Sequence, residues 1–252
     1  MTNKLKYFVG NWKMFGDFTS FKTVNKINQF SRKYKKLHKN KIILCVPNTL
    51  IFFFNKKLQS KNISLGAQNC HYYQNYGPFT GSVNSQMLKK TGAEYIILGH
   101  SENRSEGDTD KIIEKKINSS IKNKLNVIFC IGESYKQKKN GKTFSTLRKQ
   151  MKNSLKKISN LNKIILAYEP IWSIGTNNIP KASQLKKTIK FIKNESKKIL
   201  KIKKPIKVLY GGSVDPNNAR SFSFIKEIDG FLIGRASQSA KKFIDIIENY
   251  YK

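Results

Sequence analysis

The sequence predicts an α/β protein in which strands and helices alternate to form a closed (β/α)8 barrel, with residues 1–252 as one domain. Short apolar runs alternate with amphipathic segments eight times, in units of roughly thirty residues. No linker or low-complexity segment interrupts this series. The length of 252 residues is also typical of such a barrel as one domain.

The eight strands are predicted from apolar runs typical of strands buried on both faces. They cover residues 7–9, 42–46, 63–67, 95–98, 127–131, 164–168, 207–210 and 230–233. Helices are predicted between strands where apolar residues recur every three or four positions. These helices contain the sets Phe21/Val24/Ile27, Ile113/Ile117/Ile121, Leu147/Met151/Leu155, Ala182/Leu185/Ile189/Ile192 and Ala240/Phe243/Ile247. An open doubly wound sheet is the alternative, but it normally has a glycine-rich dinucleotide turn after its first strand, and residues 10–14 do not form one.

The chain is extremely basic, with 49 Lys and Arg against 15 Asp and Glu and a formal charge of +34. Such a charge can indicate a protein that binds nucleic acid or a membrane surface. However, 44 of the basic residues are Lys and they occur from end to end of the chain, together with many Asn and Ile, as a genome rich in A and T would encode. Nucleic-acid readers favour Arg for bidentate contacts. We therefore favour composition as the explanation and expect neither a nucleic-acid nor a membrane partner.

The three cysteines, Cys45, Cys70 and Cys130, lie in or beside apolar strand runs. Their odd number and positions predict reduced core thiols. Residues 1–14 have no apolar signal region, and no run approaches the ~20 apolar residues of a membrane span. We expect a protein of the reducing cytoplasm.

In a (β/α)8 barrel the chemistry lies at the C-terminal ends of the strands. The residues predicted there are Asn11, Lys13, Gln68, His100, Ser101, Glu102, Glu133, Glu169, Gly211, Gly212, Ser213, Gly234 and Arg235. Glycine-containing turns after the seventh and eighth strands are typical phosphate sites. No Cys/His cluster has metal-ligand spacing and no Ser-His-Asp set converges, so neither a metal nor that triad is expected.

Glu169 follows a buried apolar strand, where a carboxylate has no evident structural purpose. Pro170 restricts the backbone beside it and prevents a helix from starting earlier. The following ten or so residues are too apolar for an ordinary exposed loop and lack helical periodicity. This pattern predicts a catalytic base next to a lid that excludes water.

Nine segments in order along the chain resemble the triosephosphate isomerase family, whose fold is the TIM barrel. They are GNWKM at 10–14, AQN at 67–69, FTG at 79–81, GHSE at 99–102, CIGE at 130–133, YEPIW at 168–172, IGT at 174–176, YGGSV at 210–214 and DGFL at 229–232. The resemblance covers essentially the whole chain. It implies interconversion of dihydroxyacetone phosphate and glyceraldehyde 3-phosphate, a step of glycolysis and gluconeogenesis, without a cofactor.

The resemblance also implies residue roles, which are those of the family's known acid–base mechanism. Glu169 would shuttle the proton, His100 would polarise the carbonyl oxygens as a neutral imidazole, and Lys13 with Asn11 would stabilise the enediolate. A short helix beginning at Ser101 would disfavour the imidazolium. Phosphate would meet N–H groups of Gly175, Ser213, Gly234 and Arg235, besides Asn11 and Lys13. The lid would include Pro170, Ile171, Trp172, Ile174, Gly175, Thr176 and Pro180, and the supporting residues would be Glu102, Cys130, Glu133 and Tyr210.

The family is dimeric, and the resemblance implies that residues 74–82, with Thr80 as the contact residue, reach into the partner beside Asn11 and Lys13. Several positions depart from the family. Ser82 replaces a glutamate, Asn103 replaces an arginine, and Arg235 stands where many members have glycine. In the family the tyrosine matching Tyr210 bonds a backbone N–H at the lid's far hinge, which counting from Glu169 places at Pro180. Proline has no N–H to donate, so this bond cannot form here.

Two other functions remain as alternatives. One is a different phosphosugar enzyme on the same barrel, which the ordered set of motifs disfavours. The other is a basic nucleic-acid-binding protein that retains the barrel as a scaffold. The combination of Lys13, His100 and Glu169 disfavours the second, because binding alone does not require it.

Overall fold

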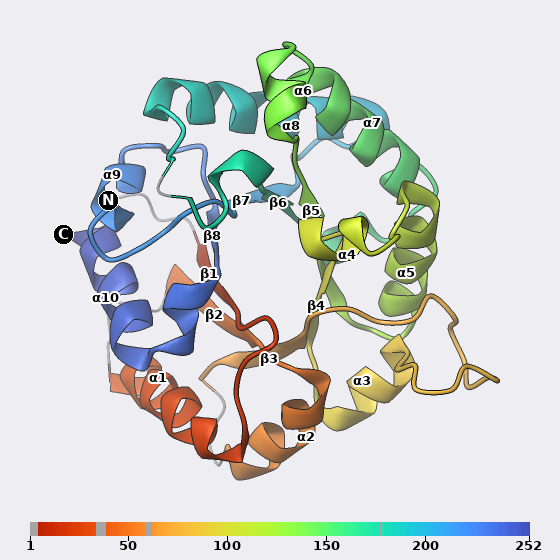
Figure 1. Cartoon of the computed structure of the whole chain (residues 1–252), viewed down its shortest axis with the longest axis vertical. Coiled ribbons are helices and arrows are strands. Elements are labelled where there is room, and N and C mark those ends of the chain that lie inside the picture. Colours follow the sequence, from red (N-terminus) through yellow and green to blue (C-terminus); the bar gives the residue numbers. More distant parts are fainter. Residues whose placement is uncertain (1–4, 34–38, 59–61, 177) are drawn as a thin grey trace.

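A computed structural model of the chain describes residues 5–33, 39–58, 62–176 and 178–252. Its eight strands are all parallel and form one closed barrel in sequence order (Figure 1). They are β1 (Lys6–Asn11), β2 (Asn40–Cys45), β3 (Ser64–Ala67), β4 (Tyr95–Leu98), β5 (Asn126–Ile131), β6 (Ile164–Tyr168), β7 (Lys207–Tyr210) and β8 (Gly230–Ile233). The barrel closes where β1 pairs with β8, with Gly10 opposite Ile233. The predicted single-domain (β/α)8 barrel is confirmed.

Helices form the outer ring of the barrel (Figure 1). They are α1 (Phe21–Lys33), α2 (Asn48–Lys57), α3 (Ser85–Thr91), α4 (Ser101–Ser105), α5 (Asp110–Lys122), α6 (Tyr135–Lys139), α7 (Thr143–Leu155), α8 (Ala182–Leu200), α9 (Ala219–Ser223) and α10 (Ala240–Tyr251). The 3-10 turns are η1 (Phe18–Ser20), η3 (Leu161–Lys163), η4 (Ile171–Ser173) and η5 (Arg235–Gln238). The five predicted helical patterns correspond to α1, α5, α7, α8 and α10. None of the described helices has both the length and the apolar character of a membrane span.

Two hydrophobic layers follow from the alternation of side chains along each strand. Val9, Cys130 and Leu209 belong to the cluster inside the barrel. Their strand neighbours, such as Phe8 and Phe129, belong to the larger cluster that also includes buried residues of the helices. The barrel is therefore a packed core, and its strand ends form a rigid platform.

The observed strands differ from the predicted ones only at their ends. Strand β1 runs from Lys6 to Asn11, although only residues 7–9 were predicted, because its polar ends also pair with β2. Helix α2 was not predicted, because Phe52 is exposed among buried apolar neighbours and obscures the spacing of three to four. Residues 171–173 form a 3-10 turn within a segment predicted to lack helix.

Candidate active site

Three strand ends position the proposed catalytic side chains. Asn11 is the last residue of β1, while His100 and Glu169 follow β4 and β6, and all three are buried. Lys13 has a φ of 57°, which is uncommon for a residue with a side chain. Its N–H donates to Asn11 Oδ1 at 3.1 Å. The structure thus brings together the four residues that were predicted from separate segments of the sequence.

The hydrogen bonds of His100 indicate which ring nitrogen carries the proton when the imidazole is neutral. His100 is the N-cap of α4, and its Nδ1 accepts the N–H of Glu102 at 3.2 Å. An accepting Nδ1 carries no proton, so in the neutral ring the proton is on Nε2. Nε2 lies 3.2 Å from Glu169 Oε1. The ring therefore directs a donor into the site, and the short helix expected at Ser101 is present.

Glu169 lies in a tight, buried position. A side chain at Gly132 would place its Cβ 1.7 Å from the Glu169 carbonyl oxygen, and one at Gly211 would place it 2.9 Å from Glu169 Cγ. Burial raises the pKa of Glu169, while His100, the Ser101 N–H and the Cys130 thiol partly oppose that rise. Burial raises the pKa of Cys130 as well, so this thiol remains protonated beside the carboxylate. A carboxylate with a raised pKa suits a base that must gain and lose a proton near neutral pH.

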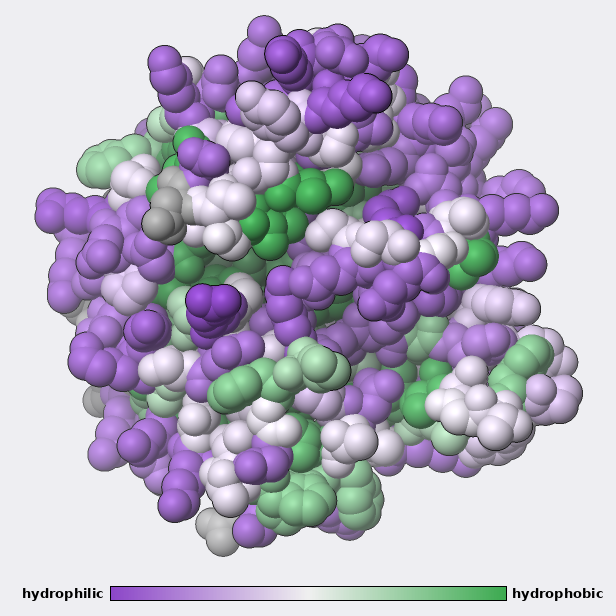
Figure 2. Space-filling model, in the orientation of Figure 1, coloured by the Kyte–Doolittle hydropathy of each residue, from purple (hydrophilic) through white to green (hydrophobic). Residues whose placement is uncertain are grey.

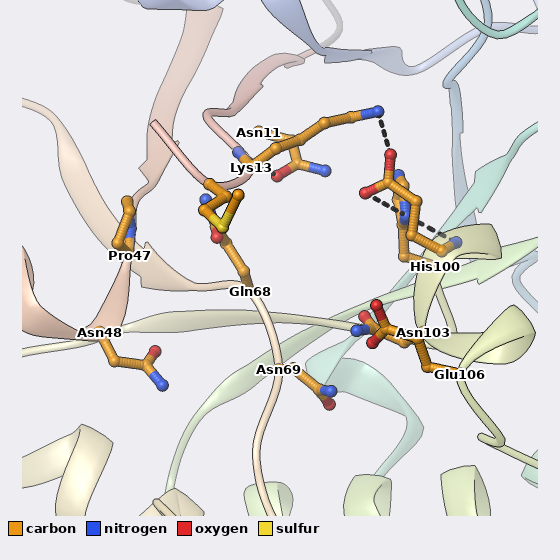
Figure 3. A pocket seen from close by; sticks show the side chains of 11 residues that line it. Asn11, Lys13, Pro47, Asn48, Gln68, Asn69, His100, Asn103 and Glu106 are labelled. Carbon is orange, nitrogen blue, oxygen red and sulfur yellow. Dashed lines mark hydrogen bonds and ion pairs between the residues drawn. The ribbon is translucent and has the colours of Figure 1, made fainter. Parts of the chain in front are cut away.

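Glu102 pairs with Lys13 at the mouth of the site. Its Oε1 is 2.5 Å from Lys13 Nζ, whereas its contact with the His100 ring is made by its backbone N–H. Figure 3 shows the lysine extended across the pocket towards this carboxylate. The sequence placed Glu102 at the strand end, but only the structure reveals that it holds the cation.

A pocket of about 330 Å³ opens over these residues (Figure 3). Its walls come from the loops that follow β1 to β4. The lining residues are Asn11, Lys13, Met14, Pro47, Asn48, Gln68, Asn69, His100, Glu102, Asn103 and Glu106. Glu169, which is only 3% exposed, is not among the residues that line it. The pocket thus extends beyond Asn11, Lys13 and His100 to residues such as Met14 and Asn103.

The predicted phosphate-binding residues lie in the loops after β6, β7 and β8. Gly175 has a φ of 68°, and a Cβ there would meet no atom within 4 Å, so its glycine serves the backbone conformation. A Cβ at Gly234 would lie 4.0 Å from Lys13 Cε, so the lysine side chain passes close to the last turn. Gly234 caps η5, which begins at Arg235. Arg235 does not have a positive φ. Its N–H therefore meets the condition expected for a donor to phosphate.

The start of the lid is held by a buried carboxylate. Glu133 Oε1 accepts Trp172 Nε1 at 2.9 Å and Tyr168 Oη at 3.1 Å. The Glu133 carbonyl oxygen accepts the N–H of Ile171 at 3.1 Å. On the other side, Lys138 Nζ lies 3.1 Å from the centroid of the Trp172 ring. Trp172 is therefore held between a carboxylate and a cation.

Three functional contacts were missed from the sequence. These are the stacking of Lys138 on Trp172, the Lys13–Glu102 ion pair, and a bond between Ser173 Oγ and Tyr210 Oη at 3.3 Å. Each joins segments 34 or more positions apart, so no local pattern could reveal it. Asn177, at the far end of the lid, lies outside the described residues.

The barrel and its strand-end groups define the class: a (β/α)8 enzyme equipped for proton transfer. Across the part of the chain that the structure describes, no group of three His, Cys, Asp or Glu is arranged to hold a metal ion. A family model described as "Triosephosphate isomerase" matches residues 6–250. The chain belongs to the triosephosphate isomerase family.

Curated relatives agree over nearly the full length. Triosephosphate isomerase of Thermodesulfovibrio yellowstonii is 39% identical over 249 residues, covering 96% of this chain and 98% of the relative. That of Mycoplasmopsis pulmonis is 39% identical over 246 residues, with 95% of each covered. The crystal structure of triosephosphate isomerase from Bartonella henselae superimposes with a TM-score of 0.86 at 33% identity, covering 98% and 99%. Nothing in these comparisons supports the nucleic-acid-binding alternative.

Proposed function

We propose that this enzyme interconverts dihydroxyacetone phosphate and D-glyceraldehyde 3-phosphate through an enediolate, with Glu169, His100, Lys13 and Asn11 as its catalytic residues. The observation that carries the proposal is the 3.2 Å approach of His100 Nε2 to Glu169 Oε1, although their strands β4 and β6 are separated by β5. A donor and a base this close can act on adjacent atoms of one small substrate.

Glu169 takes a proton from C1 of the ketone, and the electron pair of that C–H bond forms the C1–C2 double bond of the enediolate. The hydroxyl proton of O1 passes to O2 and the carbon-bound proton returns to C2, which leaves the aldehyde at C1 and a hydroxyl at C2. His100 Nε2–H donates to the substrate oxygens as they gain charge, so the imidazole need not be cationic. Lys13 supplies a positive charge near the same oxygens, and the Asn11 amide supplies a neutral donor.

The phosphate is held by the N–H groups of Gly175, Ser213, Gly234 and Arg235. Turn 211–213 and η5 are supported for this role by their position after β7 and β8. The approach of the Lys13 side chain to Gly234 adds a cation on that side. A phosphate bound here positions the reacting carbons over the buried carboxylate.

The lid protects the intermediate as well as the substrate. An exposed enediolate can use its electron pair to break the C3–O bond, which releases inorganic phosphate. The enol aldehyde that remains then ketonises to methylglyoxal. This loss needs no oxidant or reductant. The enzyme prevents it by excluding water and by holding the C3–O bond in the plane of the enediolate, where it cannot overlap with the π electrons.

The acting unit is proposed to be a homodimer formed through residues 74–82. The segment between β3 and α3 projects from the barrel at the right of Figure 1. Residues 62–88 contain no charged residue, although the chain carries +34 overall. Tyr76 is 60% exposed, and Met14 beside Lys13 is fully exposed. A partner's loop seated on the outer part of the 330 Å³ pocket would cover both apolar surfaces.

A reducing cytoplasm is the proposed compartment, since Cys45, Cys70 and Cys130 are all buried free thiols. The activity is tested by a coupled isomerase assay on the purified chain in both directions. Turnover without added metal or cofactor supports the proposal. Absence of turnover, with retention on a polyanion resin that declines across a salt series, would instead favour the nucleic-acid-binding alternative.

A further inference from the structure

The lid, residues 170–180, is fastened to the barrel near its beginning. Ile171 and Trp172 donate to Glu133, and Ser173 Oγ pairs with Tyr210 Oη. Beyond Gly175, the hydrogen bonds of the described lid residues stay within the lid, such as Thr176 Oγ1 to the Trp172 carbonyl oxygen. The described hydrogen bonds that hold the lid to the barrel therefore come from residues 171–173.

The Ser173–Tyr210 pair is a buried polar contact. Both residues have 0% exposure, and their hydroxyl oxygens are 3.3 Å apart. Burial raises the pKa of Tyr210 to about 12, so the phenol keeps its proton at neutral pH and can donate. A buried hydroxyl that loses its partner remains unsatisfied, which makes such a pair costly to separate.

Tyr210 also contacts the proposed phosphate turn. A Cβ at Gly212 would lie 2.2 Å from Tyr210 Oη, so the hydroxyl sits directly against this backbone. Phe222 holds the other side of the ring, with centroids 5.0 Å apart. The same tyrosine hydroxyl therefore touches the lid through Ser173 and turn 211–213 through Gly212.

We propose that Ser173 is a positioning residue whose hydrogen bond to Tyr210 couples the lid to the phosphate-binding turn. A phosphate ester that fixes turn 211–213 also fixes the tyrosine, and the tyrosine holds the first turn of the lid in place. The inference rests on the proposed isomerase function for its catalytic consequences. The contact itself is present in the structure and does not depend on the reaction.

The test is a double-mutant cycle with Ser173→Ala, Tyr210→Phe and the double variant. Each single variant should bind 2-phosphoglycolate about fivefold more weakly, as expected for one lost hydrogen bond. Each should also release several times more methylglyoxal per turnover. The double variant should be no worse than either single variant, because the same bond is removed in all three.

Two further variants separate positioning from general stability. Ser173→Thr keeps a hydroxyl and should restore affinity and by-product fraction. Ser196→Ala removes another fully buried serine hydroxyl, on α8, which donates to the Lys193 carbonyl oxygen and has no lid contact. It should leave both measurements unchanged even if it lowers the melting temperature.

Hydrogen exchange of lid amides in the free protein tests the coupling without turnover. Ser173→Ala should speed exchange over residues 171–176, whereas Ser196→Ala should not. Equal exchange in these two variants, or additive effects in the double variant, would overturn the inference. If Ser173→Ala exchanges faster than Ser196→Ala but the parent protein catalyses no isomerisation, the coupling stands and the proposed function fails instead.

Discussion

Glu169 and Ile171 are separated by a single residue, yet they belong to parts of the molecule that are held differently. Glu169 is 3% exposed, lies against Gly132 and Gly211, and interacts with His100. Ile171 is 38% exposed and lies in the first turn of the lid, from which the described hydrogen bonds between lid and barrel come. The first region takes its geometry from the register of β strands, and the second from a few side-chain contacts.

This difference suggests a division of tasks. The proposed catalytic residues at the strand ends, Asn11, Lys13, His100 and Glu169, are called the catalytic floor. They should determine whether the proton is transferred. The lid, the projecting loop and the surface charge should determine whether the intermediate is retained, whether the site is complete and how fast substrate arrives. Substitutions in the floor should therefore reduce turnover far more than those in its surroundings.

The largest effect is expected from Glu169→Gln. The variant keeps the shape of the side chain but removes the base, so kcat should fall by about 1,000-fold. Binding of 2-phosphoglycolate should stay within roughly tenfold. Glu195→Gln, which disrupts only an ion pair with Arg148, is the matched control and should retain full activity. More than about a tenth of the parent activity in the first variant would exclude Glu169 as the base.

A smaller loss is expected from Thr80→Arg in the projecting loop. A charge placed in a desolvated partner pocket should shift the protein towards a weakly active monomer. Sedimentation would measure the state of assembly, and turnover at low protein concentration should drop at least about tenfold. Ser183→Arg, an exposed position on α8, is the control. An unchanged dimer in the Thr80 variant would rule out this loop as the central contact.

The pH profile tests the environment of the floor. Burial raises the pKa of Glu169, so the ionised base appears only at a higher pH than for an exposed glutamate. The acid limb of kcat/KM should therefore lie above the usual range of a carboxyl group, and activity should fall as pH drops through it. An acid limb at the pKa of an exposed glutamate would contradict a dry site.

A still smaller effect is expected from Pro180→Ala. Proline cannot donate the hinge N–H that the family resemblance assigns to the tyrosine hydroxyl, a loss of about 1 kcal/mol for the closed lid. Restoring the N–H should lower the methylglyoxal released per turnover and tighten 2-phosphoglycolate binding about fivefold. Global stability should change little. Identical by-product and affinity in both proteins would mean that the hinge lies elsewhere or that Ser173 already satisfies Tyr210.

Surface charge should have the smallest effect, and should act on encounter. Residues 134–214 contain 21 Lys or Arg and two acidic residues. Figure 2 shows hydrophilic side chains over much of the face that it presents. For a dianionic substrate, kcat/KM should fall about threefold between about 10 and 150 mM chloride while kcat changes less. A flat profile for kcat/KM would show that the lysine excess plays no part in substrate capture.

The sequence by itself determined the architecture and the end of the barrel where chemistry occurs. Apolar runs such as 164–168 must be buried on both faces, and eight of them alternating with helices can satisfy this in a parallel barrel. Parallel strands place all their C-terminal ends on one side. Asn11, His100 and Glu169 could therefore be grouped before any distance was known.

Only the tertiary structure decided which of those groups touch. Glu102 could have faced solvent, but the positive φ of Lys13 and the start of α4 bring the two side chains together. Ser173 reads as an ordinary lid residue until the pairing of β6 with β7 places it against Tyr210. Such contacts depend on strand pairing and on side-chain packing between segments far apart in the chain. A local pattern encodes the burial of each partner, but their contact exists only after the whole chain has folded.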